Sequence, residues 1–304
     1  MQNKYKKLIL SILLLILLGF IWGSGYSIAH YAMTHGVPPL GYSFWQSLGP
    51  AIVLLIFCLV KEGRLNISLR YVRYYLIAGL LGIALPNTNM YFAASHLPAG
   101  ILAVIVNTVP IMMYPLALLV RQEKFQWLRM AGVLLGVIGI IMVVSSKSSL
   151  PTSSMTWWAL LTLLSPLFFA ICALYIVHDR PKNSSSLSLS AGMLIATAII
   201  LMPLVIDTHQ FYPLNSFSTP NLVVILEIIL SSIGYVIFFQ LLKLAGAVYY
   251  SLVGGVVALT GLFWGWLLFD EKLYMWTVIA VICIIVALCV VTLLQTTQRS
   301  SNEY

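Results

Sequence analysis

The most regular feature of the chain is a series of long apolar runs, separated by short breaks of charged, proline or serine residues. A helix that crosses a bilayer needs about 20 mostly apolar residues, and each of these runs is long enough. The runs lie near 8–29, 40–60, 73–95, 98–120, 127–145, 156–178, 187–207, 221–243, 247–269 and 273–295. The pattern therefore predicts an all-α polytopic membrane protein with ten transmembrane helices.

The composition agrees with a membrane protein. Hydrophobic residues make up 61% of the chain and charged residues 8%, whereas about 25% of the residues in a soluble domain are charged. So little polar surface excludes a soluble enzyme, a secreted disulfide scaffold and a disordered tail. The net charge of +8 would suggest nucleic acid in a soluble chain. Here the basic residues lie between apolar runs, so we expect a lipid bilayer as partner and no nucleic acid.

The basic residues are distributed unevenly over the two ends of the predicted bundle. Ten spans place both termini on one side, and fourteen of the 16 basic residues fall on that side, among them Arg129 at the start of the run 127–145. Lys147 and Lys272 fall on the other side. Because basic loops stay on the cytoplasmic side, we expect both termini in the cytoplasm. The first run follows lysines as a signal peptide does, but no small-residue cleavage site ends it, so we expect a retained helix.

An internal repeat is indicated by a polar, serine-rich stretch at Lys147–Met155, which divides the ten runs into two sets of five. A shift of 148 residues lays Glu123-Lys124 on Glu271-Lys272, an acidic and basic pair in an otherwise uncharged context. Because five is an odd number, the second copy would enter the membrane inverted, as in many carriers. The alternative is a chance alignment of apolar sequence.

The repeat gives the expected domain organisation. Residues 1–146 form the first five-helix repeat, 147–155 a linker, and 156–304 the second five-helix repeat with a short cytoplasmic tail. The fold class predicted for the chain is thus ten transmembrane helices arranged as two inverted five-helix repeats.

Glycines, aromatic residues and short turns recur at motif-like spacing in both halves. These motifs are Leu18–Tyr26, Ala93–Ser95, Leu97–Ala99, Pro110, Glu123-Lys124, the glycines Gly132, Gly136 and Gly139, Leu244–Ala247 and Asp270–Lys272. Taken together they resemble the drug/metabolite transporter superfamily, in its bacterial EamA-type branch of ten-helix carriers. The resemblance implies carrier-type transport of small organic solutes, often export, across the inner membrane of a bacterium. Two departures, Ala258 opposite Pro110 and Phe168-Phe169 at the second Trp-Gly-like position, bear on the substrate and not on the fold.

Polar side chains inside the predicted spans are the candidate binding residues, because lipid-facing polar groups are penalised. At a rise of about 1.5 Å per residue, seven of them lie between the midplane and the outer face, on helices of both halves. Two aromatic residues join them, because their rings suit apolar or cationic solutes. The predicted substrate-binding residues are Trp22, Tyr26, Gln46, Asn87, Tyr91, Asn107, Glu227, Tyr235 and Trp264.

Three of these polar residues, Asn87, Asn107 and Glu227, are expected to face one internal cavity. For Gln46 and Asn107 the alternative is hydrogen bonding that merely ties helices together. Glu227 is the acidic residue placed well within a span, and three interpretations stay open for it. It binds a cationic group of the solute, it couples transport to protons, or it reaches headgroup water at the interface.

No Walker loop, catalytic triad or zinc spacing occurs in the sequence, so we predict no enzyme, no cofactor and no metal. The predicted function is a secondary carrier for a small organic metabolite, such as an amino acid or a related solute, that works by alternating access with export as the expected direction. A multidrug or toxic-compound exporter is the alternative within transport. A membrane-embedded lipid-modifying enzyme and a non-transporting membrane receptor are the alternatives outside it.

Overall fold

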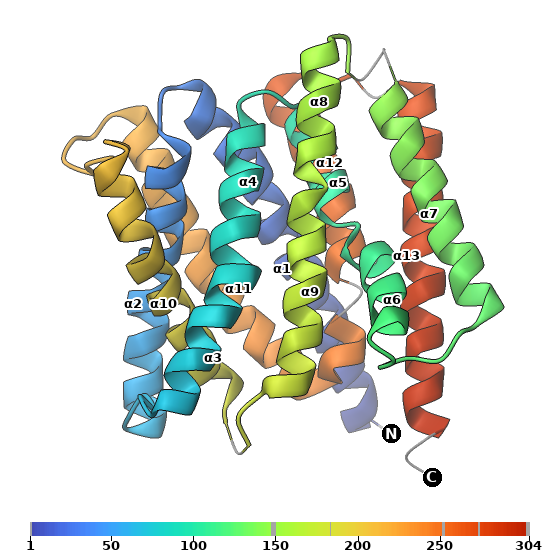
Figure 1. Cartoon of the computed structure of the whole chain (residues 1–304), viewed down its shortest axis with the longest axis horizontal. Coiled ribbons are helices and arrows are strands. Elements are labelled where there is room, and N and C mark those ends of the chain that lie inside the picture. The colour runs from blue at the N-terminus through green and yellow to red at the C-terminus, as the bar shows by residue number, and fades with distance from the viewer. Residues whose placement is uncertain (1, 147–149, 183, 251–252, 273, 302–304) are drawn as a thin grey trace.

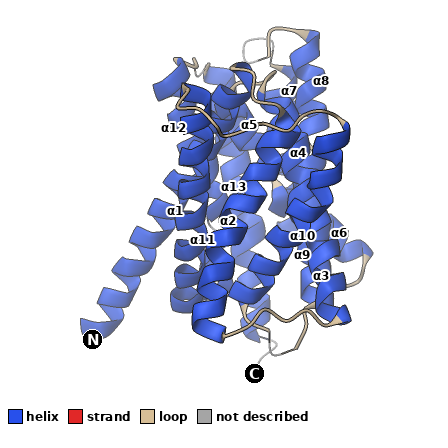
Figure 2. Cartoon of the chain, turned by 90° about the vertical axis from the view of Figure 1, so that its left-hand side faces the viewer, coloured by secondary structure: helices blue, strands red, loops and turns tan. Residues whose placement is uncertain are grey.

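The computed structural model describes residues 2–146, 150–182, 184–250, 253–272 and 274–301, and every regular element in these ranges is a helix (Figures 1 and 2). Of the expected linker, residues 147–149 lie outside the described residues. The first half contains α1 (Gln2–Thr34), α2 (Pro39–Glu62), α3 (Leu69–Gly79), the π-helix η1 (Leu80–Ala84), α4 (Leu85–Ala94), α5 (Ala99–Val106), α6 (Val109–Leu119) and α7 (Trp127–Ser145). The second half contains α8 (Ser153–Thr162), α9 (Leu164–Asp179), α10 (Ser186–Asp207), α11 (Thr219–Tyr250), α12 (Val253–Phe269) and α13 (Met275–Ser301).

These helices account for the ten predicted spans. Within the described residues, nine segments are long and apolar enough to cross a membrane, with α3–η1–α4, α5–α6 and α8–α9 each counting as one, and the shorter apolar α12 adds a tenth of 17 residues. The prediction of an all-α, ten-helix membrane fold is confirmed. The predicted boundary between the eighth and ninth runs is wrong, because α11 continues to Tyr250. No proline occurs in 244–250, and the single Gly246 costs only about 1 kcal/mol in a helix, so nothing there ends α11.

Three of the spans are interrupted, and prolines explain the positions. A proline ring clashes with the carbonyl of the fourth residue before it and removes one backbone hydrogen bond. Counting back four residues from Pro86, Pro110 and Pro166 leads to η1, to the end of α5 and to the end of α8. Three further prolines lie inside α2, α6 and α10 without ending these helices.

The main contacts between the two halves each have a counterpart in which the equivalent helices of the other half take part. In the first half α1 packs on α11 and α12, and its equivalent in the second half, α9, packs on α4 and α6. Likewise α2 packs on α11 as α10 packs on α3, while α2–α10, α5–α12 and α7–α13 are pairs of equivalent helices. In Figure 1, α1 rises from the end that carries both termini, whereas α8 starts at the opposite end. The repeats are therefore inverted, as the odd number of spans predicts. We call these two ends of the bundle the terminal end and the opposite end.

The outer surface is apolar and the helix contacts are close. Leu119, Trp127 and Ile141 are among many large apolar side chains on the exterior, which is expected where lipid tails replace water. Between membrane helices, small residues allow the backbones to approach. At the α7–α13 contact, a Cβ added to Gly139 would lie 2.9 Å from the carbonyl oxygen of Ala280. The apolar core thus holds the helices in place around a few buried polar groups.

Candidate functional site

A buried carboxylate on α11 is the centre of the candidate site. Glu227 lies eight residues after the first residue of α11, about 12 Å along the helix, and its side chain is 7% exposed. Its Oε1 accepts hydrogen bonds from Gln46 Nε2 at 3.1 Å and Ser231 Oγ at 2.9 Å. Its Oε2 is buried and has no hydrogen-bond partner among the described residues. This position inside the bundle argues against the interpretation that Glu227 reaches headgroup water.

Three tyrosines lie within electrostatic range of this carboxylate. The hydroxyl groups of Tyr42, Tyr91 and Tyr235 are close enough to Glu227 to interact with it electrostatically. The rings of Tyr42 and Tyr91 meet edge to face with centroids 4.7 Å apart, and those of Trp22 and Tyr235 at 6.2 Å. Side chains of α1, α2, α4 and α11 therefore converge on one point from both halves.

Two members of this cluster were not expected from the sequence. Ser231 follows Glu227 by one helical turn, and Tyr42 precedes Gln46 by one turn, so the spacing of four residues was the available signal. The hydroxyl of Tyr42 is buried and, within the described part of the chain, makes no hydrogen bond. On α1, a Cβ added to Gly25 would lie 3.2 Å from Glu227 Oε1, so this glycine lets the helix backbone approach the carboxylate.

A second polar group of the site lies at the break between α5 and α6. Asn107 Nδ2 donates hydrogen bonds to Tyr26 Oη at 3.0 Å and to the carbonyl of Ala103 at 2.8 Å. Tyr26 lies one turn after Trp22 on α1, on the same side of that helix. On α12, a Cβ added to Gly254 would meet only Asn107 Oδ1, at 3.6 Å. Gly254 of α12 therefore lies next to the Asn107 amide.

The consecutive polar residues Asn87, Thr88 and Asn89 on α4 do not all make the same kind of contact. The Thr88 and Ser43 hydroxyls are 3.0 Å apart, and Asn89 Nδ2 donates to the Leu161 carbonyl at 3.0 Å, so both residues tie neighbouring helices together. Asn87 makes no comparable hydrogen bond among the described residues and lies one turn before Tyr91, on its side of the helix. Asn87 is therefore the member of this cluster that belongs with the candidate site.

Trp264 is the predicted site residue that the structure places apart from the others. Its Nε1 donates to the Phe20 carbonyl at 3.1 Å, and its ring packs edge to face against Phe20 and Phe263. Phe20, Phe263 and Trp266 are exposed, so this aromatic group lies on the outer surface of α1 and α12. The predicted residues that contacts or electrostatic interactions link to one another are Trp22, Tyr26, Gln46, Tyr91, Asn107, Glu227 and Tyr235. Asn87 lies one turn before Tyr91 on α4.

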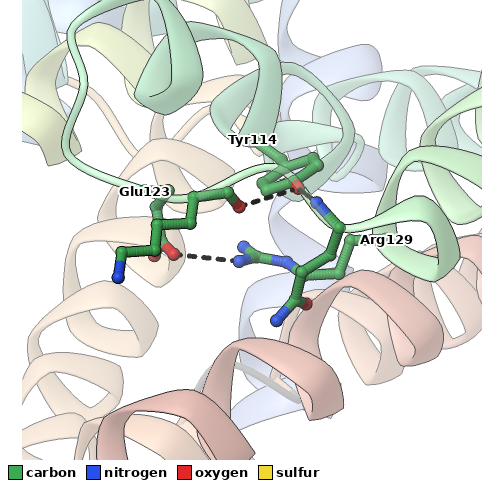
Figure 3. A network of polar contacts seen from close by, with 5 residues as sticks. Tyr114, Glu123 and Arg129 are labelled. Carbon is green, nitrogen blue, oxygen red and sulfur yellow. Dashed lines mark hydrogen bonds and ion pairs between the residues drawn. The ribbon is translucent and has the colours of Figure 1, made fainter. Parts of the chain in front are cut away.

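A separate buried ion pair lies near the terminal end, at the start of α7 (Figure 3). Arg129 is 1% exposed, its Nη1 is 3.0 Å from Glu123 Oε2, and its guanidinium lies 3.9 Å from the centroid of the Tyr114 ring. The Tyr114 hydroxyl in turn accepts the backbone N–H of Gln126 at 2.8 Å. Arg129 lies on the terminal side, as expected, but its guanidinium is buried, where it is paired with Glu123 and packed on the Tyr114 ring.

The fold and this site define a polytopic membrane transporter. A model of the EamA-like transporter family matches the chain twice, at residues 9–145 and 156–293. The chain belongs to the EamA-like transporter family, as its motifs suggest.

Individual relatives agree with this assignment. The Uncharacterized inner membrane transporter YedA of Escherichia coli K12 is 30% identical over 198 residues, which cover 62% of this chain, and in that alignment the chain spans 59% of the relative's length. The Protein PecM of Dickeya dadantii is 22% identical over 89% of this chain and 88% of its own length. The Uncharacterized transporter YoaV of Bacillus subtilis is 22% identical over 83% of this chain and 86% of its own length.

One solved crystal structure resembles the fold with a TM-score of 0.62. At 14% sequence identity, the match covers 93% of this chain and 96% of the other. This likeness shows the fold alone.

Proposed function

We propose that the protein is a secondary carrier that moves a small organic metabolite, such as an amino acid or a related solute, across the bacterial inner membrane, with export as its direction. The observation that carries the proposal is a set of buried polar groups inside an inverted-repeat fold, with Gln46 bonded to Glu227 and Asn107 bonded to Tyr26. In carriers of this architecture, solutes bind near the midplane between the repeats, and the two halves rock around the site. Relatives that are named as transporters support the assignment of the chain to membrane transport in general.

The hydrogen bonding of the cluster supports a ligand site over simple helix ties. A buried polar atom without a partner costs about 1–3 kcal/mol, so residues that only join helices are usually satisfied. Glu227 Oε2 and Tyr42 Oη are both buried and unpartnered among the described residues. These two neighbouring groups leave hydrogen-bonding capacity that a solute can use.

Alternating access also needs contacts between the halves that can break at either end. At the opposite end, Trp45 Nε1 donates to the Tyr212 carbonyl at 2.7 Å and joins α2 to the segment before α11. At the terminal end, the Ser185 hydroxyl donates to Glu62 Oε1 at 2.5 Å and joins α10 to α2. We propose that these contacts break in turn as the site opens to each side.

The orientation and the limits of the repeats belong to the same proposal. Fourteen of the 16 basic residues fall on the terminal side, which supports cytoplasmic termini. The two family matches support repeats at 1–146 and 156–304 joined by the linker 147–155.

Solute exchange in proteoliposomes tests the carrier function. The full chain is reconstituted, loaded with individual amino acids, amines and other metabolites, and assayed for uptake of the labelled solute by counterflow. We expect exchange of at least one solute, and at least a tenfold loss in Asn107→Ala. The matched control is Asn66→Ala, since Asn66 lies in the loop between α2 and α3, and it keeps the wild-type rate. Folded wild-type protein that exchanges nothing across the library would contradict the proposal, and exchange of many unrelated drugs would favour the multidrug exporter.

A further inference from the structure

We propose, on the basis of the carrier function above, that the centre at Glu227 binds a protonated amine of the transported solute. The carboxylate is the counter-ion of the amine, and Tyr42, Tyr91, Tyr235 and Trp22 form the aromatic wall around it.

One oxygen of the Glu227 carboxylate has no hydrogen-bond partner among the described residues. Glu227 Oε1 is occupied by Gln46 and Ser231, whereas Oε2 is buried and free among the described residues. A carboxylate oxygen accepts hydrogen bonds only, so its partner has to be a donor, and an ammonium group carries up to three N–H donors. Charge-assisted hydrogen bonds of this kind are the strong ones.

Glu227 also has no basic counter-ion among the described residues. The ion pairs in the described part of the chain join Arg73 to Asp179, Arg129 to Glu123 and His178 to Asp179, and none involves Glu227. Ionised side chains inside membrane proteins pair with one another or line a pathway for a substrate or ion. A cation brought by the solute supplies the charge that the protein does not provide.

An organic cation fits these surroundings better than a bare proton. A proton on Oε2 would satisfy the carboxylate but would need no aromatic surroundings. Tyr42, Tyr91 and Tyr235 lie within electrostatic range of Glu227, and the ring of Tyr42 pairs with that of Tyr91 as the ring of Tyr235 does with that of Trp22. Aromatic faces attract ammonium groups through their quadrupole, most strongly where water is excluded. The combination of one carboxylate and several rings fits an organic ammonium group.

The test uses three probes of one shape: 2-phenylethylamine, the neutral 2-phenylethanol, and the N,N,N-trimethyl derivative of the amine, which keeps the charge but has no N–H. Binding to the purified full chain is measured at pH 7 by calorimetry and by thermal stabilisation. We expect the amine to bind at least tenfold more tightly than the alcohol and more tightly than the trimethyl derivative. Equal binding of amine and alcohol would overturn the proposal.

Variants separate the carboxylate from the rest of the site. Glu227→Gln keeps the shape and removes the charge, so the amine should lose at least tenfold in affinity while the alcohol changes less than twofold. Asp207→Asn, the same change from carboxylate to amide at an exposed position at the end of α10, leaves all three affinities unchanged. A Glu227→Gln protein that keeps its preference for the amine would overturn the proposal and favour proton coupling.

Two further readouts keep the test decisive. If Glu227→Gln fails to fold, Tyr235→Leu removes one ring of the wall and should lower amine binding at least threefold, and unchanged amine binding counts against the proposal. Proteoliposome exchange is measured in parallel. Exchange without any preference for amines refutes the amine site and leaves the carrier function standing, whereas amine binding without exchange of any solute refutes the carrier function.

Discussion

Two glutamates at equivalent positions of the repeats, Glu271 and Glu123, have different partners at opposite ends of the bundle. Glu271 follows α12 and accepts the backbone N–H groups of Ala99 at 2.5 Å and Gly100 at 2.9 Å, at the first turn of α5 in the other half. Burial raises the pKa of the Glu271 carboxyl above its usual range, while these N–H groups and the nearby His30 oppose the rise. The opposite end is therefore fastened by a contact between the halves.

At the terminal end, Glu123 pairs with Arg129 of its own half, and the guanidinium packs against the face of the Tyr114 ring (Figure 3). The positions 148 residues further on hold Thr277 in place of Arg129 and Leu262 in place of Tyr114. The duplication thus preserves the carboxylate but not its surroundings. An ion pair within one half persists when the halves separate, whereas a contact between the halves has to break. We therefore interpret the contact of Glu271 with Ala99 and Gly100 as a movable closure, and Arg129 as a fixed element of the scaffold.

The largest effect is expected from removing the fixed cation. Arg129→Met leaves Glu123 without its described counter-charge, and breaking a buried pair costs about 3–5 kcal/mol. Thermal unfolding in detergent should show this loss, while Arg64→Met in the exposed loop after α2 changes nothing. An Arg129→Met protein as stable as wild type would contradict the interpretation of Arg129 as a fixed element of the scaffold.

The next effect concerns the movable closure. Glu271→Ala removes two charge-assisted hydrogen bonds and should shift the protein towards opening at the opposite end. A single cysteine in place of the buried Leu97, in a background without the native cysteines, should then react with maleimide at least fivefold faster. In Glu123→Gln the labelling rate should stay at the wild-type value, and equal acceleration by both substitutions would show that the two glutamates do not differ in this way.

A smaller effect is expected from crowding the same closure. A Cβ at Gly265 would fall within contact distance of the Glu271 carboxylate, whereas a Cβ at Gly255 on the same helix meets nothing within 4 Å. Gly265→Ala should therefore destabilise the protein by about 1–3 kcal/mol. Gly255→Ala is the matched control and should be neutral or slightly stabilising. Equal melting temperatures for the two variants would contradict the close contact at Glu271.

The smallest effect sharpens the description of the ion pair. Tyr114→Phe keeps the ring beside Arg129 but loses the hydroxyl that accepts the N–H of Gln126, at a cost of about 1 kcal/mol. Tyr114→Leu also removes the ring and should cost more. If the two substitutions have equal effects on the melting temperature, the ring does not contribute to holding Arg129.

The spans and their number could be predicted from the sequence because a bilayer demands long apolar runs, and the breaks between runs carry most of the charge. The repeat was visible through Glu123-Lys124 and Glu271-Lys272, since charged pairs are rare among apolar residues. The end of α11 was not predictable in this way, because an apolar helix and an apolar loop near the membrane edge have similar composition.

The candidate site was predictable in its polar members and less so in its aromatic ones. Glu227 and Asn107 stand out because polar side chains within a span are costly. An aromatic residue, by contrast, can lie on the outer surface, as Trp264 does beside Phe20, or inside the bundle within electrostatic range of a carboxylate, as Tyr42 does. The rotation of each helix about its axis decides whether such a side chain faces the exterior or the interior of the bundle. This rotation depends on packing between segments far apart in the sequence. The burial of Arg129 was hidden for the same reason.

The most direct measurement is a structure of the full chain with an exchanged solute bound, determined by electron cryomicroscopy in a lipid nanodisc. We expect density for the solute between α1, α2 and α11, with a donor nitrogen about 2.7–2.9 Å from Glu227 Oε2 and the Asn107 amide beside it. Solute density elsewhere, for example beside the outer aromatic group at Trp264, with Glu227 Oε2 bonded to the protein itself, would contradict the claim that the solute is carried at this centre between the two halves.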